Sequence, residues 1–449
     1  MPPPHRDQKQ RPRPSGYAAR ELVVECLAAV LDRGRPLDDA FEAAVVLHGN
    51  DLPARDRAFA RLIVMTVLRR KGELDAVLDA FLEKPLPANG GRIRPILLSA
   101  AAQLLFLDTP PHAAISLAVD QCRDTTKTQR FAGLTNAVLR RVSTTGKDVL
   151  AGVDAVTANI PARLLENWQQ AYGADTARAV AEASLAEAAL DLSIKSDASA
   201  WAEKLGGVLL PTSTVRLARA GRVEDLPGYA EGAWWVQDAA AALPSRLLGD
   251  VRGRDVADLC AAPGGKTAEL AAAGAHVTAV DSSAIRLRRL AENMTRLQLE
   301  AEIVEADATA WDPGRQFDAV LLDAPCSATG TIRRHPDILR LKRKDDTSER
   351  VALQRRLIAH AARLVKPGGV LVYGTCSLEP EEGAKIVDRF LASAEDMERV
   401  PLTPGEAGID GAWLTAEGDL RTLPCHLPNP DPALAGLDGF FAARLRKRA

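Results

Sequence analysis

The sequence has no paired-cysteine motif and no long apolar segment. Its six cysteines, at positions 26, 122, 260, 326, 376 and 425, include no C-x-x-C pair, which argues against a structural zinc site and a disulfide framework. No apolar run reaches about eighteen residues, the length of a membrane-spanning helix. Residues 1–16 are rich in Pro, Arg, Lys and Gln and lack the apolar stretch of a secretory signal, so we interpret them as a disordered tail. These absences predict a cytoplasmic protein with reduced thiols, no membrane segment and no bound metal.

The sequence also lacks an excess of charge of either sign, because 57 Lys and Arg residues are balanced by 59 Asp and Glu residues. A protein that coats nucleic acid without specificity would be strongly basic, so any RNA binding must depend on local patches. The alternative to RNA binding is that each patch is an ordinary solvent-exposed surface. The candidates are Arg333 and Arg334, the run Arg340, Lys342, Arg343 and Lys344, and the terminal group Arg444, Arg446, Lys447 and Arg448.

A length of 449 residues predicts two or three domains. The first, over residues 17–142, is expected to be an all-α bundle, because apolar residues recur at three- and four-residue steps between Gly and Pro. Residues 143–160 lack this periodicity and are interpreted as a linker, and 161–245 as a small mixed α/β region. The segments expected to be helical are 20–31, 58–68, 73–81, 93–106, 113–122, 162–172 and 174–187, and strands are expected at 190–195 and 214–217.

Strand and helix patterns alternate regularly in the third domain, residues 246–449. Such alternation predicts a doubly wound parallel sheet, whose ligands lie at the carboxyl ends of the strands. The expected strands are 256–259, 276–280, 302–304, 317–322 and 370–373, and the expected helices are 266–273, 284–297 and 349–364.

The first of these strands enters the motif Asp258-Leu-Cys-Ala-Ala-Pro-Gly-Gly-Lys-Thr267. It is not a P-loop, because the position of the leading glycine holds Cys260, and no G-x-G-x-x-G is present. The turn through Gly264 and Gly265 lets the backbone approach a ligand, and the following helix N-terminus favours a carboxylate. The methionine part of S-adenosylmethionine carries such a group.

Acidic residues end the next two strands. Asp281 is placed where an acidic residue hydrogen-bonds ribose hydroxyls in this architecture, and Asp307 is placed to contact the adenine side. Asp281 also precedes a helix, so an N-cap is the alternative interpretation.

Two cysteines follow the fourth and fifth strands, in Asp323-Ala-Pro-Cys-Ser-Ala-Thr-Gly330 and Tyr373-Gly-Thr-Cys-Ser377. A lone buried cysteine is usually inert, but two in adjacent loops beside Asp323 indicate chemistry. A thiolate that adds to carbon 6 of cytosine makes carbon 5 able to accept a methyl group, and Asp323 is the candidate acid for ring nitrogen 3. The Pro-Cys loop nominates Cys326 as the nucleophile by analogy with DNA enzymes, but spacing alone leaves the choice open.

Taken together, these motifs resemble the Fmu/Sun family of RNA cytosine-5 methyltransferases, in particular its members that act on bacterial small-subunit (16S) rRNA. Arg333-Arg-His-Pro-Asp337 and Gly439 before Phe440 and Phe441 fit the same family. Residues 111–115 and 131–140 are similar to a NusB-type helical RNA-binding domain. The resemblance implies a NusB-like bundle, a small RNA-binding subdomain over 161–245 and a Rossmann-like class I methyltransferase core. Residues 190–195 depart from the family by lacking its Arg and Asn, and 427–436 resembles an insertion.

The resemblance also implies roles for individual residues. It makes Cys376 the nucleophile, with Cys326 assisting release and Asp323 completing the catalytic set. It implies S-adenosylmethionine as cofactor and a monomer that binds rRNA, free or partly assembled into the small subunit. The cofactor site would be lined by Cys260, Ala261, Ala262, Pro263, Gly264, Gly265, Lys266, Asp281, Asp307 and Asp323.

Two other functions remain open at this level. A noncatalytic RNA-binding assembly factor could retain the fold, although the intact Cys326, Cys376 and Asp323 argue against it. An enzyme of the same chemistry could act on tRNA, and the NusB-like domain favours rRNA only by analogy.

Overall fold

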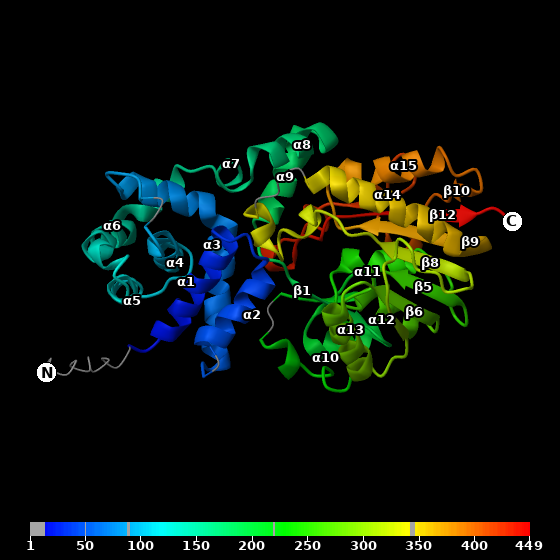
Figure 1. Cartoon of the computed structure of the whole chain (residues 1–449), viewed down its shortest axis with the longest axis horizontal. Helices are drawn as coiled ribbons and strands as arrows, with labels where there is room; N and C mark the ends of the chain where they lie inside the picture. The colour runs from blue at the N-terminus through cyan, green and yellow to red at the C-terminus, as the bar shows by residue number, and fades with distance from the viewer. Residues whose placement is uncertain (1–13, 50, 88–89, 219–220, 342–345) are drawn as a thin grey trace, which may run out of the picture. The chain divides into compact units, whose positions relative to one another are not determined.

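The computed structural model describes residues 14–49, 51–87, 90–218, 221–341 and 346–449, and they form two compact units (Figure 1). The helical unit comprises the described residues up to Leu164 and a short segment that begins at His335; the sheet unit comprises the rest. Of the predicted tail, only 14–16 are described, and Lys342, Arg343 and Lys344 also lie outside the described ranges. No helix within these ranges is both long and apolar enough to cross a membrane.

The helical unit confirms the predicted all-α bundle and has a single hydrophobic core. Helix α3 joins two segments predicted as separate helices, and its backbone departs from helical geometry at Arg70 (φ −107°, ψ 17°). The helices in the described part of the unit are α1 (Tyr17–Leu31), α2 (Leu37–His48), α3 (Ala54–Phe81), α4 (Ile93–Leu105), α5 (Pro111–Arg123), α6 (Ala132–Ala151) and α7 (Ala155–Asn159).

The predicted linker, 143–160, is wrong, because α6 continues to Ala151 and α7 follows it. Residues 143–145, Ser-Thr-Thr, are unfavourable for a helix by local propensity. In the helix, the Thr144 and Thr145 hydroxyls donate to main-chain carbonyls one turn earlier. Gly146 is buried, and a Cβ there would lie 3.1 Å from a Leu105 methyl. The missing side chain therefore allows α6 to pack closely where the apolar pattern fades.

A segment from far along the chain completes the helical unit. Asp337 lies in this segment, and its Oδ2 accepts a hydrogen bond from the backbone N of Leu37 (3.0 Å), the first residue of α2. Pro36, at the N-cap position, makes no side-chain cap bond, so Asp337 supplies the cap. Arg340 donates through Nε to the carbonyl of Leu68 (2.8 Å). The compact helical unit therefore includes residues beyond the predicted 17–142.

The small mixed region contains an antiparallel sheet in the order β2-β3-β1-β4. A buried ion pair crosses it, with Arg216 Nε and Nη2 each 2.7 Å from a carboxylate oxygen of Asp191. Arg216 Nη1 also donates to the carbonyls of Leu434 and Gly436, so the predicted insertion is anchored to this sheet. The elements are α8 (Ala162–Tyr172), α9 (Ala174–Ser184), β1 (Leu190–Ile194), α10 (Ala198–Leu205), β2 (Val208–Leu209), β3 (Thr214–Leu217) and β4 (Trp234–Val236).

The large sheet confirms the predicted doubly wound core. Its path is β10-β12-β9-β8-β5-β6-β7, with β11 paired to β12. Strands β5 to β9 are parallel, whereas β12 runs antiparallel to β9. The strands are β5 (Asp255–Leu259), β6 (His276–Asp281), β7 (Glu302–Glu305), β8 (Phe317–Asp323), β9 (Val365–Thr375), β10 (Met397–Arg399), β11 (Leu420–Thr422) and β12 (Phe440–Lys447), with helices α11 (Ala239–Arg246), α12 (Gly265–Ala272), α13 (Ala284–Leu297), α14 (Asp346–Leu364) and α15 (Ala384–Leu391).

The cap on α2 yields a testable prediction. Asp337→Ala should destabilise the start of α2 by about 1 kcal/mol, because the N–H of Leu37 loses its acceptor. Amide hydrogen exchange should then be faster at 37–40 than in wild type. Asp79→Ala, which removes an exposed carboxylate from α3, is the control and should leave this exchange unchanged. Equal protection in Asp337→Ala and wild type would contradict the cap.

Candidate functional site

The predicted site residues gather at the carboxyl edge of the large sheet. Asp258 lies near the end of β5, Asp281 and Asp323 end β6 and β8, and Cys376 directly follows β9. Parallel pairing brings these strand ends to one edge, and the strand order reverses between β5 and β8. Ligands of doubly wound sheets bind at such a reversal. The structure therefore brings together residues that lie far apart in the sequence.

The loop between β5 and α12 needs unusual backbone conformations. Cys260 has φ 62° and Gly264 has φ 101°. A Cβ on Gly264 would lie 2.8 Å from Leu290 Cγ, so glycine is required both by conformation and by space. Ala261 N donates to the carbonyl of Val280 (3.0 Å), which fixes the loop to the neighbouring strand.

Asp281 supports the same loop through its buried carboxylate. Its Oδ2 accepts from Ala262 N (3.2 Å) and lies 3.2 Å from the Arg286 guanidinium, and its Oδ1 accepts from Ser283 N (3.0 Å). The N-cap of α13 is Ser283, whose side chain accepts from Arg286 N. The alternative that Asp281 is the N-cap of this helix is therefore wrong.

Asp258 is a fully buried carboxylate whose role the sequence reasoning missed. Its Oδ2 accepts from Thr267 Oγ1 (2.6 Å), whereas its Oδ1 has no hydrogen-bond partner among the described residues. Burial raises the pKa of Asp258 to about 7, although the Thr267 hydrogen bond lowers it. A buried acceptor left open at a ligand-binding edge fits a bound polar group. The signal in the sequence was the position of Asp258 at the start of the motif Asp258–Thr267.

Lys266 connects the loop to β8. Its Nζ lies 2.8 Å from Asp323 Oδ2 and 4.9 Å from the centre of the Phe440 ring. Burial lowers the pKa of Lys266, but the Asp323 carboxylate outweighs burial and the pKa is raised overall. Lys266 is therefore an ammonium at neutral pH, and Asp323 has a cation in direct contact.

The two cysteines lie side by side, as predicted from the adjacent strands. Their Sγ atoms are 3.4 Å apart, and both residues are partly buried. The hydrogen bond with Cys326, together with burial, raises the pKa of the Cys376 thiol well above its usual value. Cys376 is therefore a protonated thiol at neutral pH in this state of the protein.

Asp307 follows β7 and is exposed. Its Oδ1 accepts from both N and Oγ1 of Thr309, at 2.8 Å each. These hydrogen bonds lower the pKa of Asp307. The carboxylate is thus ionised and held in one orientation at the same edge of the sheet.

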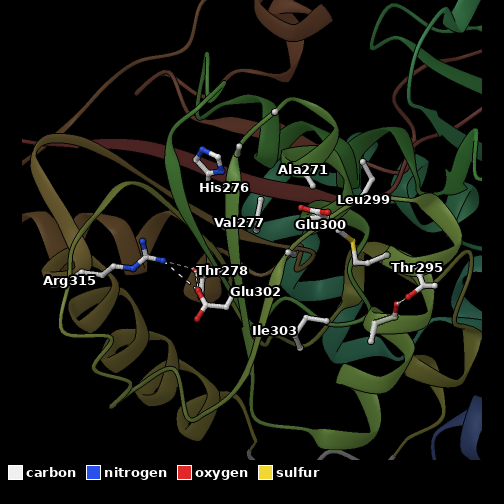
Figure 2. Close-up of a pocket in the computed structure, with 15 residues that line it drawn as sticks. Ala271, His276, Val277, Thr278, Thr295, Leu299, Glu300, Glu302, Ile303 and Arg315 are labelled. Atoms are coloured by element: carbon white, nitrogen blue, oxygen red, sulfur yellow. Dashed lines mark hydrogen bonds and ion pairs between the residues drawn. The ribbon is translucent and has the colours of Figure 1, made fainter.

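A surface pocket of about 780 Å³ lies at the opposite edge (Figure 2). Its lining includes His276 and Glu302, the first residues of β6 and β7, and Arg315, which is paired with Glu302. Within the described ranges, none of the predicted site residues lines it. Because ligands of parallel sheets bind at the carboxyl edge, this pocket is separate from the candidate site.

The basic residues proposed as RNA patches have mostly internal partners. Arg333 is 1% exposed and lies among Asp238 and Asp438, and Arg334 pairs with the same two carboxylates at 2.6 and 3.0 Å. Arg340 is bonded inside the helical unit. Ion pairs also engage Arg444, Lys447 and Arg448, with Glu406, Asp396 and Glu398 respectively. The structure therefore contradicts an RNA surface at Arg333, which is buried, whereas Arg334 is 21% exposed and paired with both carboxylates.

Comparisons with known proteins show the family of the chain. Residues 246–446 match the family model described as 16S rRNA methyltransferase RsmB/F, and residues 17–144 match the NusB family. The chain is 37% identical to Ribosomal RNA small subunit methyltransferase B of Xanthomonas campestris, over 96% of this chain and 98% of that protein. The corresponding protein of Pseudomonas putida is 35% identical with the same coverage.

Solved structures show the same fold. PH0851 superposes with a TM-score of 0.74 at 24% identity, covering 98% of this chain and all of that one. A methyltransferase homologue from Pyrococcus horikoshii superposes with a TM-score of 0.53 at 28% identity, covering 68% of this chain and 99% of that one.

The raised pKa of Asp258 predicts a pH-dependent gain in stability for Asp258→Asn. In wild type the folded-state pKa lies above the unfolded value, so stability falls as pH rises from about 4 to about 7. The variant has no charge to bury, and its advantage should grow over this range to at most roughly 4 kcal/mol. Melting temperatures at pH 5 and pH 8 measure this widening difference.

Asp255→Asn is the matched control for this experiment, because Asp255 starts the same strand but its side chain is 37% exposed. Its difference from wild type should not widen with pH. A difference for Asp258→Asn that stays constant between pH 5 and pH 8 would show that burial does not raise the pKa of this carboxyl.

Proposed function

Because the chain belongs to the RsmB/F family of 16S rRNA methyltransferases, we propose that it methylates carbon 5 of a cytosine in small-subunit rRNA through a covalent cysteine adduct, with S-adenosylmethionine as methyl donor. The observation that carries this proposal is the pair of thiols, Cys326 and Cys376, with sulfurs 3.4 Å apart beside Asp323. A noncatalytic assembly factor would have no need of two adjacent thiols and a neighbouring carboxylate.

The loop between β5 and α12 fits the proposed cofactor. Its glycine turn allows close approach, and the open Oδ1 of Asp258 is an acceptor for a polar group. We assign the ribose to Asp281, whose carboxylate can accept further hydrogen bonds beside those from Ala262 and Ser283. We assign the adenine side to Asp307. When bound, S-adenosylmethionine supplies a methyl group on a positively charged sulfur.

The nucleophile is assigned to Cys376, following the family. Its thiol is protonated because its pKa is raised, so the attack on carbon 6 of the cytosine must transfer this proton, and we assign the nearby Asp323 carboxylate as its acceptor. The new carbon–sulfur bond directs the ring electrons to carbon 5, which takes the methyl group. We propose that the Lys266–Asp323 pair supplies the proton for ring nitrogen 3, since Lys266 carries an ammonium in contact with Asp323.

Release reverses the addition. A base removes the proton from carbon 5, the carbon–sulfur bond at carbon 6 breaks, and Cys376 leaves with that electron pair. Cys326 is in hydrogen-bond contact with the Cys376 sulfur, so we assign it to assist this step. The helical unit, which matches the NusB family over 17–144, is proposed to bind the RNA from which the target base is flipped out.

The cysteine assignment is tested with RNA that carries 5-fluorocytosine, from which the adduct cannot eliminate. Wild type should form a stable covalent complex and Cys376→Ala should form none, because it lacks the attacking sulfur. Cys326→Ala should form the complex and should also accumulate adduct on ordinary RNA, because release is impaired. Denaturing gel electrophoresis separates the complexes. The opposite pattern in the two variants would make Cys326 the nucleophile.

The cofactor assignment is tested by calorimetric titration with S-adenosylmethionine. Asp281→Ala removes an anchor of the loop and the ribose acceptor, so affinity should fall by about tenfold or more. Ser283→Ala is the matched control, since it removes the cap of α13 and leaves the carboxylate in place. Unchanged affinity in Asp281→Ala would remove Asp281 from the cofactor site.

A further inference from the structure

The two thiols lie beyond the last residues of β8 and β9, so the sheet ladder alone does not fix them. The last hydrogen bond between the ends of these two strands is donated by Ala324 N to the Gly374 carbonyl (2.8 Å). Past this point, Gly330 N donates to the Cys376 carbonyl (2.9 Å). The residues that follow Cys326 and Cys376, Ser327 and Ser377, are buried, so their polar groups need partners in the interior.

The shared partner of Ser327 and Ser377 is the carboxylate of Glu382. Glu382 ends the short helical turn Pro380–Glu382 and is completely buried. Its two oxygens accept from the backbone N of Ser327, at 3.0 and 3.1 Å, and Oε2 also accepts from the hydroxyls of Ser327 and Ser377. Ser327 directly follows Cys326 and Ser377 directly follows Cys376. One buried carboxylate is thus bonded to the neighbour of each thiol.

The surroundings keep this carboxylate in place. Arg350 Nε lies 3.3 Å from Oε1, and Gln354 Nε2 is within hydrogen-bond distance of the same oxygen (3.4 Å). Gln354 Nε2 also donates to the carbonyl of Pro325 (2.8 Å), so Cys326 is held through both of its neighbours. Tyr373, in β9, donates its hydroxyl to the main-chain carbonyl of Glu382 (2.7 Å). A buried charge with this many donors resists displacement, because each lost bond would leave it partly desolvated without compensation.

The two serine hydroxyls meet at this carboxylate. Ser327 Oγ lies 2.9 Å from Ser377 Oγ, and both hydroxyls donate to Oε2 of Glu382. Ser377 Oγ also accepts from Glu379 N (3.0 Å), and the Ser377 carbonyl accepts from Arg421 (2.7 Å). The position of each sulfur relative to the other therefore depends on Glu382, which lies in the connection from β9 to α15 that also carries Cys376.

We propose that Glu382 is a positioning residue that sets the separation of the Cys326 and Cys376 sulfurs, so that one thiol can form the adduct while the other stays near enough to assist release. The inference rests on the proposed two-thiol mechanism, but the placement of the sulfurs can be measured without RNA or cofactor. Glu382 does not contact the substrate in this mechanism and acts through Ser327 and Ser377.

The distance-dependent test is oxidation by diamide, which takes two electrons and two protons from a pair of thiols and leaves a disulfide. Wild type should form the Cys326–Cys376 disulfide rapidly, because its sulfurs are already 3.4 Å apart and disulfide geometry tolerates little displacement. Glu382→Gln turns an amide NH₂ toward the serine donors and should lose most of this rapid reaction. Mass spectrometry of the linked peptides gives the rate.

The matched control is Glu381→Gln. Glu381 is in the same helical turn, but its side chain is 45% exposed and pairs with Lys385, so both oxidation and methylation should stay at wild-type rates. Glu382→Asp keeps the charge and should recover part of the oxidation rate. In methylation assays Glu382→Gln should lower kcat by about a hundredfold with little change in KM for RNA, the cost of misplacing reacting groups by about 1 Å.

The outcomes separate this inference from the proposed function. Disulfide formation at the wild-type rate in Glu382→Gln would overturn the positioning role, even if methylation were lost. Slow disulfide formation in Glu382→Gln, with no adduct on 5-fluorocytosine RNA in wild type, would support the positioning role and refute the adduct mechanism. If Glu382→Gln does not fold, as judged by its melting temperature, the same criterion applies to Ser377→Ala, which removes the hydroxyl that donates to Glu382 and accepts from Glu379 N and should slow oxidation more mildly.

Discussion

The pairing of β8 with β5 on one side and β9 on the other is the constraint on which the site depends. Its register places Asp258 beside Leu321 and Asp323 beside Gly374. Because the three strands are parallel, their carboxyl ends open at the same edge, and a slip of one residue would turn each side chain to the other face of the sheet. The loop between β5 and α12, the Lys266–Asp323 pair and the two thiols all depend on this register.

Buried charges fix the loops that the sheet itself does not reach. Glu382 bonds to the residues after both cysteines, and Arg216 holds the segment that ends at Gly436. Arg334 bridges Asp238 and Asp438 in the same way. Each of these groups loses hydration on burial, and the loss is offset only where geometry supplies several partners. Asp258 is buried as well, and its Oδ1 has no hydrogen-bond partner among the described residues.

The loop that carries Cys326 leads into the segment that completes the helical unit. Arg334 is bonded within the sheet unit, and only two residues later the chain contributes Pro336 and Asp337 to the helical unit. A domain organisation inferred along the sequence could not find this, because apolar periodicity reports which face of a local element is buried. It does not report which distant element covers that face.

The sequence by itself determined the all-α bundle, the alternating core and the place of the strand-end motifs, because helix and strand periodicity and loop glycines are local properties. The local motifs alone were enough to place Asp281, Asp323 and Cys376 at the ends of strands. Only the tertiary structure decided which charges are buried. Three glutamates follow Cys376 closely, and nothing local distinguishes Glu382 from Glu381; Arg333 and Arg334 resemble surface cations until their carboxylate partners, Asp238 and Asp438, are in place. The burial of a charge depends on partners supplied from far along the chain, and these meet only when the fold has formed.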